Sequence, residues 1–157
     1  MCNTLLKTEL KNIQELKKYV GKHIGLSDWF KIKQKDINAF AKLTHDEQWI
    51  HTDLEKSKKY SPYKMTVAHG FYVLSLATKF VYETFKIKSV KMGVNYGLDR
   101  VRFMSPTFSG GYIRGSISLV EASIEKGSAK YKMSITFEQK AHDKPVCVAE
   151  FLAMAYE

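Results

Sequence analysis

The chain has 157 residues, 45% hydrophobic and 26% charged, which is enough for one domain with a continuous core and too little for two. Its net charge of +9 favours an anionic partner, but scattered lysines and the lack of zinc-finger or RNA-recognition patterns argue against nucleic acid. No segment is apolar enough to span a bilayer, and two cysteines, Cys2 and Cys147, fit a reducing cytosol, which predicts a cytoplasmic protein.

Residues 1–20 are predicted to form an amphipathic helix that precedes a single domain over residues 21–157. The stretch has no uninterrupted apolar core of signal-peptide length. Gly21 follows it and is a suitable helix stop. Its apolar residues recur at helical spacing: Leu6, Leu10, Ile13, Leu16 and Val20.

Two helices and a connector are expected next. A short strand over residues 29–32 precedes a helix from Asp36 to Thr44, whose buried face is marked by apolar residues at helical spacing. A second helix is expected to begin at Asp53, because Thr52 and Glu55 form a capping-box pattern. The stretch THDEQWIHTD, residues 44–53, would then connect two helix ends.

Residues 67–85 are apolar almost all the way round a helix, so this helix must be enclosed by other structure. Four long segments follow, rich in β-branched and aromatic residues and separated by turn signals; they cover residues 94–103, 111–125, 130–139 and 146–156. The pattern predicts an α+β fold in which an antiparallel sheet curls around one long helix. The sheet would keep an open edge, and we expect two copies of the chain to pair there.

The connector carries a candidate acid/base pair, Asp46 and His51. On a continuous helix their spacing would turn the side chains about 140° apart, at about 100° per residue, so a shared site requires the connector. Asp46 follows one predicted helix end, and His51 precedes a helix N-terminus, where partial positive charge disfavours the imidazolium. The alternative is that both groups are merely solvated.

Two further features would complete a site. Gly70 opens the enclosed helix, where its unpaired amide could donate to a carbonyl oxygen that becomes negative during reaction; alternatively, the glycine admits a neighbouring side chain. His69 is interpreted as a residue of the core or as a support behind the site. Arg100 and Arg102 stand near a strand end, where an arginine can hold a phosphate, or are exposed strand residues.

Three segments together resemble the MaoC-like dehydratase family, which includes (R)-specific enoyl-CoA hydratases and nodulation protein N-like members. They are DINAFAKLTHDEQWIHTD, TVAHGFYVLSLA and NYGLDRVRFMSPTFSGG. The resemblance implies a hot-dog fold, a homodimer or dimer of dimers with acyl-thioester sites near the subunit interface, and a role in fatty acid metabolism. It also implies that Asp46 and His51 activate water for addition to a 2-enoyl thioester. The Gly70 amide would polarise the thioester carbonyl, with no metal or other cofactor.

The sequence departs from the commonest hydratase pattern between Asp46 and His51. Many hydratases carry Asn-Pro there, whereas this chain has Glu47-Gln48-Trp49-Ile50. Trp49 is therefore expected to narrow or reshape the acyl pocket, and the chain is similar to the nodulation protein N-like branch in this respect.

Hydration of a thioester of coenzyme A or acyl carrier protein is the leading hypothesis. One alternative is a hot-dog acyl-CoA thioesterase, whose carboxylate would stand on the central helix, where the chain offers only Glu83 near the far end. A second alternative is a module that binds an acyl group or a partner without catalysis.

Overall fold

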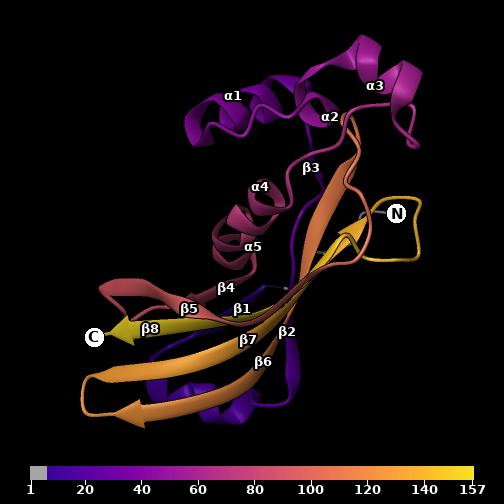
Figure 1. The fold of residues 1–157 in the computed structure, drawn as a ribbon. Helices are drawn as coiled ribbons and strands as arrows, with labels where there is room; N and C mark the ends of the chain where they lie inside the picture. The colour runs from indigo at the N-terminus through magenta and orange to yellow at the C-terminus, as the bar shows by residue number, and fades with distance from the viewer. Residues whose placement is uncertain (1–6) are drawn as a thin grey trace.

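The computed structural model describes residues 7–157 (Figure 1). This part of the chain begins with a short strand and a 3₁₀ helix, passes through five α-helices among short strands, and ends in four long strands. In order these are β1 Thr8–Leu10, η1 Ile13–Tyr19, β2 Lys22–Leu26, β3 Phe30–Lys31, α1 Gln34–Thr44, α2 Trp49–Thr52, α3 Leu54–Tyr60, α4 Gly70–Ser75, α5 Ala77–Thr84, β4 Phe85–Ile87, β5 Met92–Phe103, β6 Tyr112–Glu125, β7 Ser128–Gln139 and β8 Cys147–Tyr156.

The main sheet has six strands, five of them in the order β2-β6-β7-β8-β5, with β3 also paired to β6. All of its pairs are antiparallel. In β7 and β8 buried and half-buried residues alternate, because successive side chains of a strand point to opposite faces. The predicted antiparallel sheet is confirmed, and each predicted long strand lies within about two residues of an observed one.

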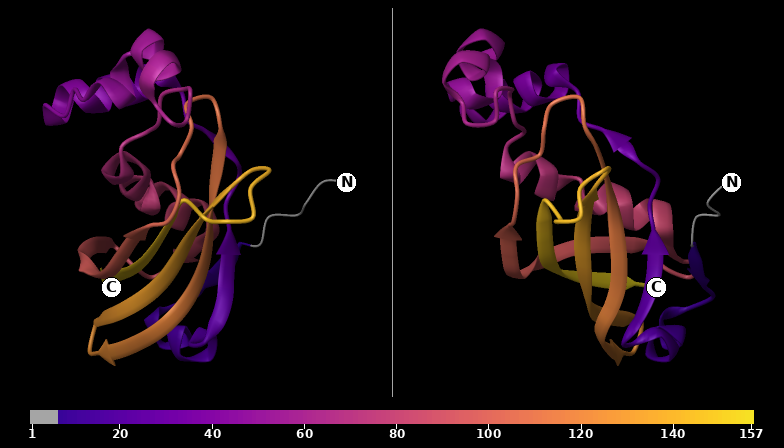
Figure 2. Two further views of the ribbon diagram at one scale, coloured as in Figure 1. Left: turned by 45° about the vertical axis from the view of Figure 1, so that its right-hand side comes forward. Right: turned by 90° about the vertical axis from the view of Figure 1, so that its right-hand side faces the viewer.

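Helices α4 and α5 lie against one face of the curved sheet, while α1, α2 and α3 gather beyond one end of it (Figure 2). Small residues let α5 approach the strands closely. A Cβ on Gly115 of β6 would stand 2.7 Å from Phe80, and one on Gly25 of β2 would stand 2.3 Å from Thr84. The sheet therefore wraps a helical layer, as the α+β prediction required.

The single enclosed helix expected over residues 67–85 is wrong in two respects. The helix begins only at Gly70 and is divided at Leu76 into α4 and α5, with a tight bond from the Leu76 amide to the Val73 carbonyl (3.1 Å) at the break. Its side chains are also not all covered, because Phe71 and Tyr82 are more than 70% exposed. The apolar residues of this segment therefore include exposed surface side chains as well as side chains of the core.

The amphipathic helix predicted over residues 1–20 is not found in residues 7–20, and residues 1–6 lie outside the described part of the chain. Strand β1 pairs in parallel with β4, and η1 follows. A 3₁₀ helix has three residues per turn, so Ile13 and Leu16 lie on one side of it and are both buried. The spacing of three residues therefore belongs to a 3₁₀ helix and not to the predicted α-helix. Gly21 lies in the turn that follows, with φ of 78°.

The expected cap of the helix after the connector is also wrong. Asp53, not Thr52, caps α3, because its carboxylate accepts a hydrogen bond from the Lys56 amide (2.8 Å). Thr52 instead ends α2, a short helix inside the predicted connector. Among residues 7–157, no helix is both long and apolar enough to cross a membrane.

Candidate active site

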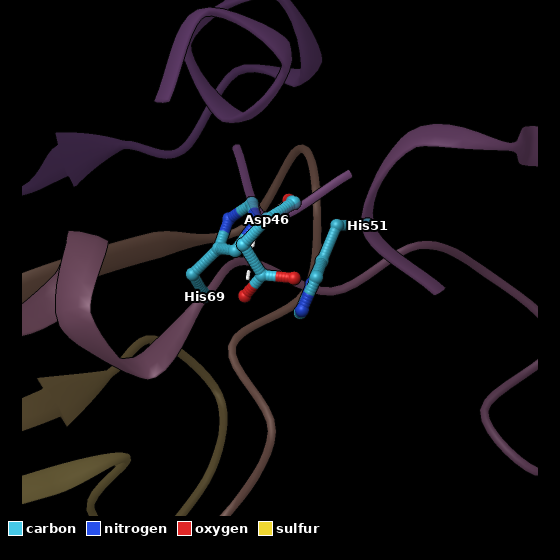
Figure 3. Close-up of side chains that lie close together, drawn as sticks. All are labelled: Asp46, His51 and His69. Carbon is cyan, nitrogen blue, oxygen red and sulfur yellow. Dashed lines mark hydrogen bonds and ion pairs between the residues drawn. The ribbon is translucent and has the colours of Figure 1, made fainter. Parts of the chain in front are cut away.

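Three side chains from separate elements meet where the helical end of the molecule joins α4 (Figure 3). His45 ends α1 in a left-handed conformation with φ of 60°, which turns the chain so that Asp46 leaves the helix axis. His51 comes from α2, and His69 is the residue that precedes α4. One nitrogen or oxygen atom from each side chain lies within 4.8 Å of the other two. The predicted pair of Asp46 and His51 is therefore brought together, and His69 joins it.

The bonding of His51 defines which nitrogen is available for chemistry. The ring is buried, and its Nδ1 lies 2.7 Å from the Val67 carbonyl oxygen. A carbonyl can only accept, so Nδ1 carries the proton and Nε2 of the neutral ring keeps its lone pair. Burial lowers the pKa of His51, as does His69, whereas the Val67 carbonyl and the Asp46 carboxylate act in the opposite direction. The neutral form is thus favoured mainly by desolvation, and the predicted position before a helix N-terminus is wrong, because His51 lies in the last turn of α2.

His69 contacts both members of the pair. Its Nε2 donates to the backbone carbonyl of Asp46 (2.9 Å), and the same nitrogen is 3.9 Å from the Asp46 carboxylate. Its ring stacks on that of His51 at a centroid distance of 3.8 Å. Of the two interpretations made from the sequence, a support for the site describes this placement better than an ordinary core residue.

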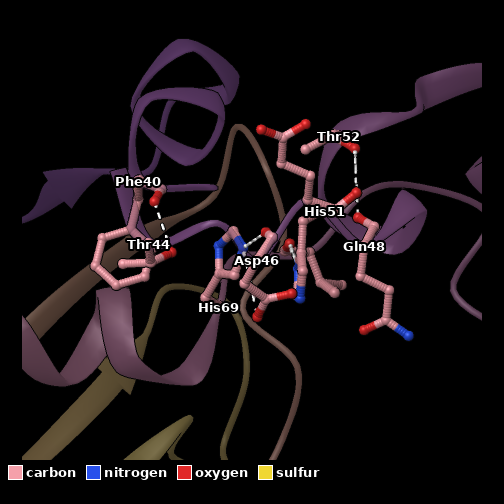
Figure 4. A network of polar contacts seen from close by, with 9 residues as sticks. Phe40, Thr44, Asp46, Gln48, His51, Thr52 and His69 are labelled. Atoms are coloured by element: carbon pink, nitrogen blue, oxygen red, sulfur yellow. Dashed lines mark hydrogen bonds and ion pairs between the residues drawn. The ribbon is translucent and has the colours of Figure 1, made fainter. Parts of the chain in front are cut away.

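Main-chain and side-chain bonds hold the connector on both sides (Figure 4). Thr44 donates to the Phe40 carbonyl (2.8 Å) and closes the last turn of α1. Gln34, at the start of α1, donates to the His51 carbonyl (2.7 Å) and accepts from the buried Thr66 hydroxyl. Gln34 was not predicted from the sequence, because nothing local marks a glutamine as a link between segments this far apart in the chain.

A cleft of about 390 Å³ is lined by chain neighbours of His51 and His69, but the three clustered side chains are not part of its lining. Gly70 stands in its wall as the first residue of α4, where a backbone amide has no intrahelical acceptor. A Cβ on Gly70 would approach the Phe103 ring to 2.9 Å, so the glycine also admits a neighbouring side chain, as the alternative reading had it. The cleft is lined by Ile50, Tyr63, Val67, Ala68, Gly70, Val73, Phe103, Met104, Ser105, Pro106, Thr107 and Val146.

Trp49 and Arg102, the other residues predicted to bind substrate, lie apart from this cleft. The Trp49 ring lies under the Lys56 ammonium at 5.3 Å. Arg102 is exposed and donates to the carbonyl of its neighbour Val101 (2.8 Å). The Phe103 side chain faces α4. Because successive side chains of a strand point to opposite faces, the Arg102 side chain points away from α4.

Two carboxylate arrangements bear on other chemistries. Glu83, the carboxylate that a thioesterase reading would need, forms an ion pair with Lys79 on α5 and borders a different, smaller hollow.

The three clustered side chains would be a candidate cation site, but His69 Nε2 and Asp46 Oδ2 are 3.9 Å apart. In the present arrangement His69 Nε2 carries the proton that it donates to the Asp46 carbonyl, so this nitrogen has no lone pair for a cation.

Comparisons with known proteins bear on the family and the fold of the chain. Residues 15–141 match the family model described as MaoC like domain. The chain is 38% identical over 141 residues to 3-hydroxyacyl-thioester dehydratase Z of Mycobacterium tuberculosis, covering 89% of this chain and 93% of that protein. It is 37% identical over 139 residues to nodulation protein N of Rhizobium leguminosarum bv. viciae, covering 86% and 85%. The solved structure of a monoamine oxidase regulatory protein from Archaeoglobus fulgidus superposes on this chain with a TM-score of 0.76 at 24% identity, over 97% of this chain and 98% of that one.

Proposed function

Because this chain belongs to the MaoC-like domain family and has the hot-dog fold, we propose that it is a hydro-lyase that interconverts 2-enoyl and 3-hydroxyacyl thioesters. The resemblance noted from the sequence is confirmed at the level of family and fold. The observation that carries the proposed reaction is the hydrogen bond from His51 Nδ1 to the Val67 carbonyl, which leaves Nε2 as a base within reach of Asp46.

In the proposed hydration, His51 Nε2 takes one proton from water while the water oxygen bonds to the β-carbon of the enoyl group. Asp46, an exposed carboxylate, accepts the hydrogen bond of the other water hydrogen and so orients the oxygen lone pair. The electron pair of the double bond moves toward the thioester oxygen. The protonated His51 then returns its proton to the α-carbon, which balances the addition and restores the neutral ring.

The Gly70 amide is assigned to the thioester oxygen. Charge accumulates on that oxygen in the enolate-like transition state, and a fixed N–H donor stabilises it there. Gly70 lies in the wall of the cleft together with Val67 and Ala68. The Val67 carbonyl accepts the hydrogen bond from His51, so the cleft wall also contacts His51, and this supports the assignment. The cleft itself is assigned to the acyl group, and the role of Trp49 in shaping that group stays a prediction.

A homodimer is proposed from the surfaces that the single chain leaves open. Strand β5 is an edge of the main sheet, with Met92, Tyr96 and Leu98 exposed along it. Phe71 and Tyr82 are exposed on the adjacent helices. An edge strand of this length is normally paired or protected, and a second copy would cover both features; a dimer of dimers is the larger variant of the same proposal.

We also propose that the acyl group is carried by coenzyme A or by acyl carrier protein, and that the protein is cytoplasmic. Cys147 is a free, buried thiol whose pKa is raised to about 11 by desolvation, which fits a packing role. The thioesterase reading is not favoured by a specific contact, since Glu83 is paired with Lys79.

The test is hydration of crotonyl-CoA and of a longer trans-2-enoyl-CoA, followed by loss of the conjugated thioester absorbance. Asp46→Asn and His51→Ala are measured beside the unmodified protein, with folding checked by circular dichroism. Loss of about 100-fold or more in both variants, the lower end of what acid/base groups contribute, supports the assignment. A folded unmodified protein that hydrates neither thioester, or unchanged rates in both variants, contradicts it.

A further inference from the structure

We infer that His69 is a positioning residue that holds the Asp46–His51 pair in its reactive arrangement. The inference rests on the proposed function for its kinetic consequence, while its structural content stands on the contacts alone. His69 reaches Asp46 through a hydrogen bond and His51 through ring stacking, so a single side chain fixes both members.

Asp46 needs an anchor because it lies in a connector between α1 and α2. Its side chain is 56% exposed, and no hydrogen bond to its carboxylate is found within residues 7–157. The bond from His69 Nε2 to the Asp46 carbonyl is 2.9 Å long and involves an imidazole that is only 3% exposed. The main chain of Asp46 is therefore held from inside the protein, and this decides where the free carboxylate can reach.

The direction of this bond also defines the state of the His69 ring. The carbonyl requires a proton on Nε2, and the buried Nδ1 has no hydrogen-bond partner within the described residues. A proton on Nδ1 would leave a buried donor unsatisfied, whereas a lone pair there costs less. The geometry thus favours a His69 ring that donates to the backbone through Nε2, and the 3.9 Å approach to the carboxylate is secondary to that bond.

Stacking gives His69 its hold on His51. The two rings are inclined by 27° with centroids 3.8 Å apart, and Phe40 contacts the His69 ring at 5.1 Å. The Val67 carbonyl fixes one edge of the His51 ring, and the stacked His69 ring fixes its plane. Together they decide where Nε2 points.

Two substitutions separate these contacts. His69→Gln keeps an N–H donor near the position of Nε2 and loses the ring, whereas His69→Phe keeps a ring for stacking and loses the donor. Phe40→Leu serves as the matched control, because it loosens the packing around His69 and leaves the donor in place. Folding of each variant is confirmed by thermal unfolding, and each is crystallised and assayed with crotonyl-CoA.

We expect His69→Phe to lose about 100-fold in kcat with little change in KM, the order of loss that a misplacement of about 1 Å can cause. His69→Gln should lie closer to the unmodified protein, and Phe40→Leu closer still. In the crystal structures, the Asp46 carbonyl should move in His69→Phe and stay in His69→Gln.

Three outcomes overturn the inference. The first is a folded His69→Phe protein with an unmoved Asp46, which decides the matter even if the unmodified protein proves inactive as a hydratase. The second is unchanged kcat in His69→Phe while the unmodified protein is active, which leaves the proposed function standing. The third is an Asp46 carbonyl displaced as far in His69→Gln as in His69→Phe, because the donor would then not be what holds Asp46.

Discussion

His51 and His69 stack face to face, with ring centroids 3.8 Å apart, and each ring donates one N–H to a backbone carbonyl. Two cations at this separation would repel each other in a partly desolvated site. The contact therefore opposes a positive charge on His51, which agrees with the lowered pKa of His51, whose largest cause is burial. A neutral His51 is the form that can take a proton from water.

The activity is expected to fall on the acid side of pH 6.5. Burial first, and His69 second among the lowering effects, bring the pKa of His51 below its ordinary value of 6.5. The base is active when unprotonated, so kcat/KM should be constant above this pKa and decline as the pH falls through it. The decline, which forms the acid limb of the pH profile, is measured from kcat/KM for crotonyl-CoA between about pH 4.5 and 8, a range that spans the ordinary histidine pKa.

Asp46→Asn provides the control for that assignment. The Asp46 carboxylate raises the pKa of His51, so its neutralisation should move the limb of the residual activity to lower pH. A limb at or above pH 6.5 in the unmodified protein, or an upward movement in Asp46→Asn, contradicts His51 as the titrating base.

Gly70→Ala tests whether the glycine serves the substrate or only the packing. The added Cβ would meet the Phe103 ring at 2.9 Å, so the single variant is expected to lose activity on either explanation. Phe103→Leu provides room in the double variant Gly70→Ala/Phe103→Leu. If the amide must contact the thioester oxygen closely, the double variant stays about 10–100-fold below Phe103→Leu alone in kcat, within the range of a weakened oxyanion donor. Full recovery would assign Gly70 to packing.

Arg102 is expected to contribute to binding only if the phosphate-bearing part of the substrate reaches the outer face of β5. Arg102→Ala should then raise KM for crotonyl-CoA and leave KM for crotonyl-pantetheine, which lacks the nucleotide phosphates, unchanged. The rise should be roughly tenfold, equivalent to about 1.4 kcal/mol. Arg100→Ala is the matched control on the same strand. Equal effects on both thioesters, or none on either, would remove Arg102 from the substrate-binding residues.

Leu98→Arg is expected to separate the proposed dimer. Leu98 is exposed on the edge strand β5 and borders a cleft of about 340 Å³ between that strand and the start of α5, so a charged side chain there opposes pairing. Val120→Arg places the same charge on a similarly exposed position of β6, away from that edge. Sedimentation at micromolar concentration should give a dimer for the unmodified protein and Val120→Arg, and a monomer for Leu98→Arg. An unmodified monomer with full activity contradicts a site shared between subunits.

Local pattern was sufficient for much of the fold. The strands β6 and β7 alternate between buried and half-buried positions over most of their length, and such alternation can be read from residues two apart. Helix α1 likewise ends at Thr44, as its apolar spacing predicted. The Asp46–His51 pair was also found from the sequence, because both residues lie in one short connector between helices.

Only the tertiary structure decided the contacts that arrange the site. His69 donates to Asp46 across 23 positions of the chain, and Thr66 donates to Gln34 across 32. Such contacts depend on how separate elements pack, and no periodicity of the sequence records them. The N-terminal helix and the unbroken helix over residues 67–85 failed for the same reason, since strand pairing with β4 and the start of α4 at Gly70 override local helix preference. The sequence by itself therefore determined the α+β class and the candidate residues of the site, while packing determined which nitrogen, carbonyl and ring face each of them uses.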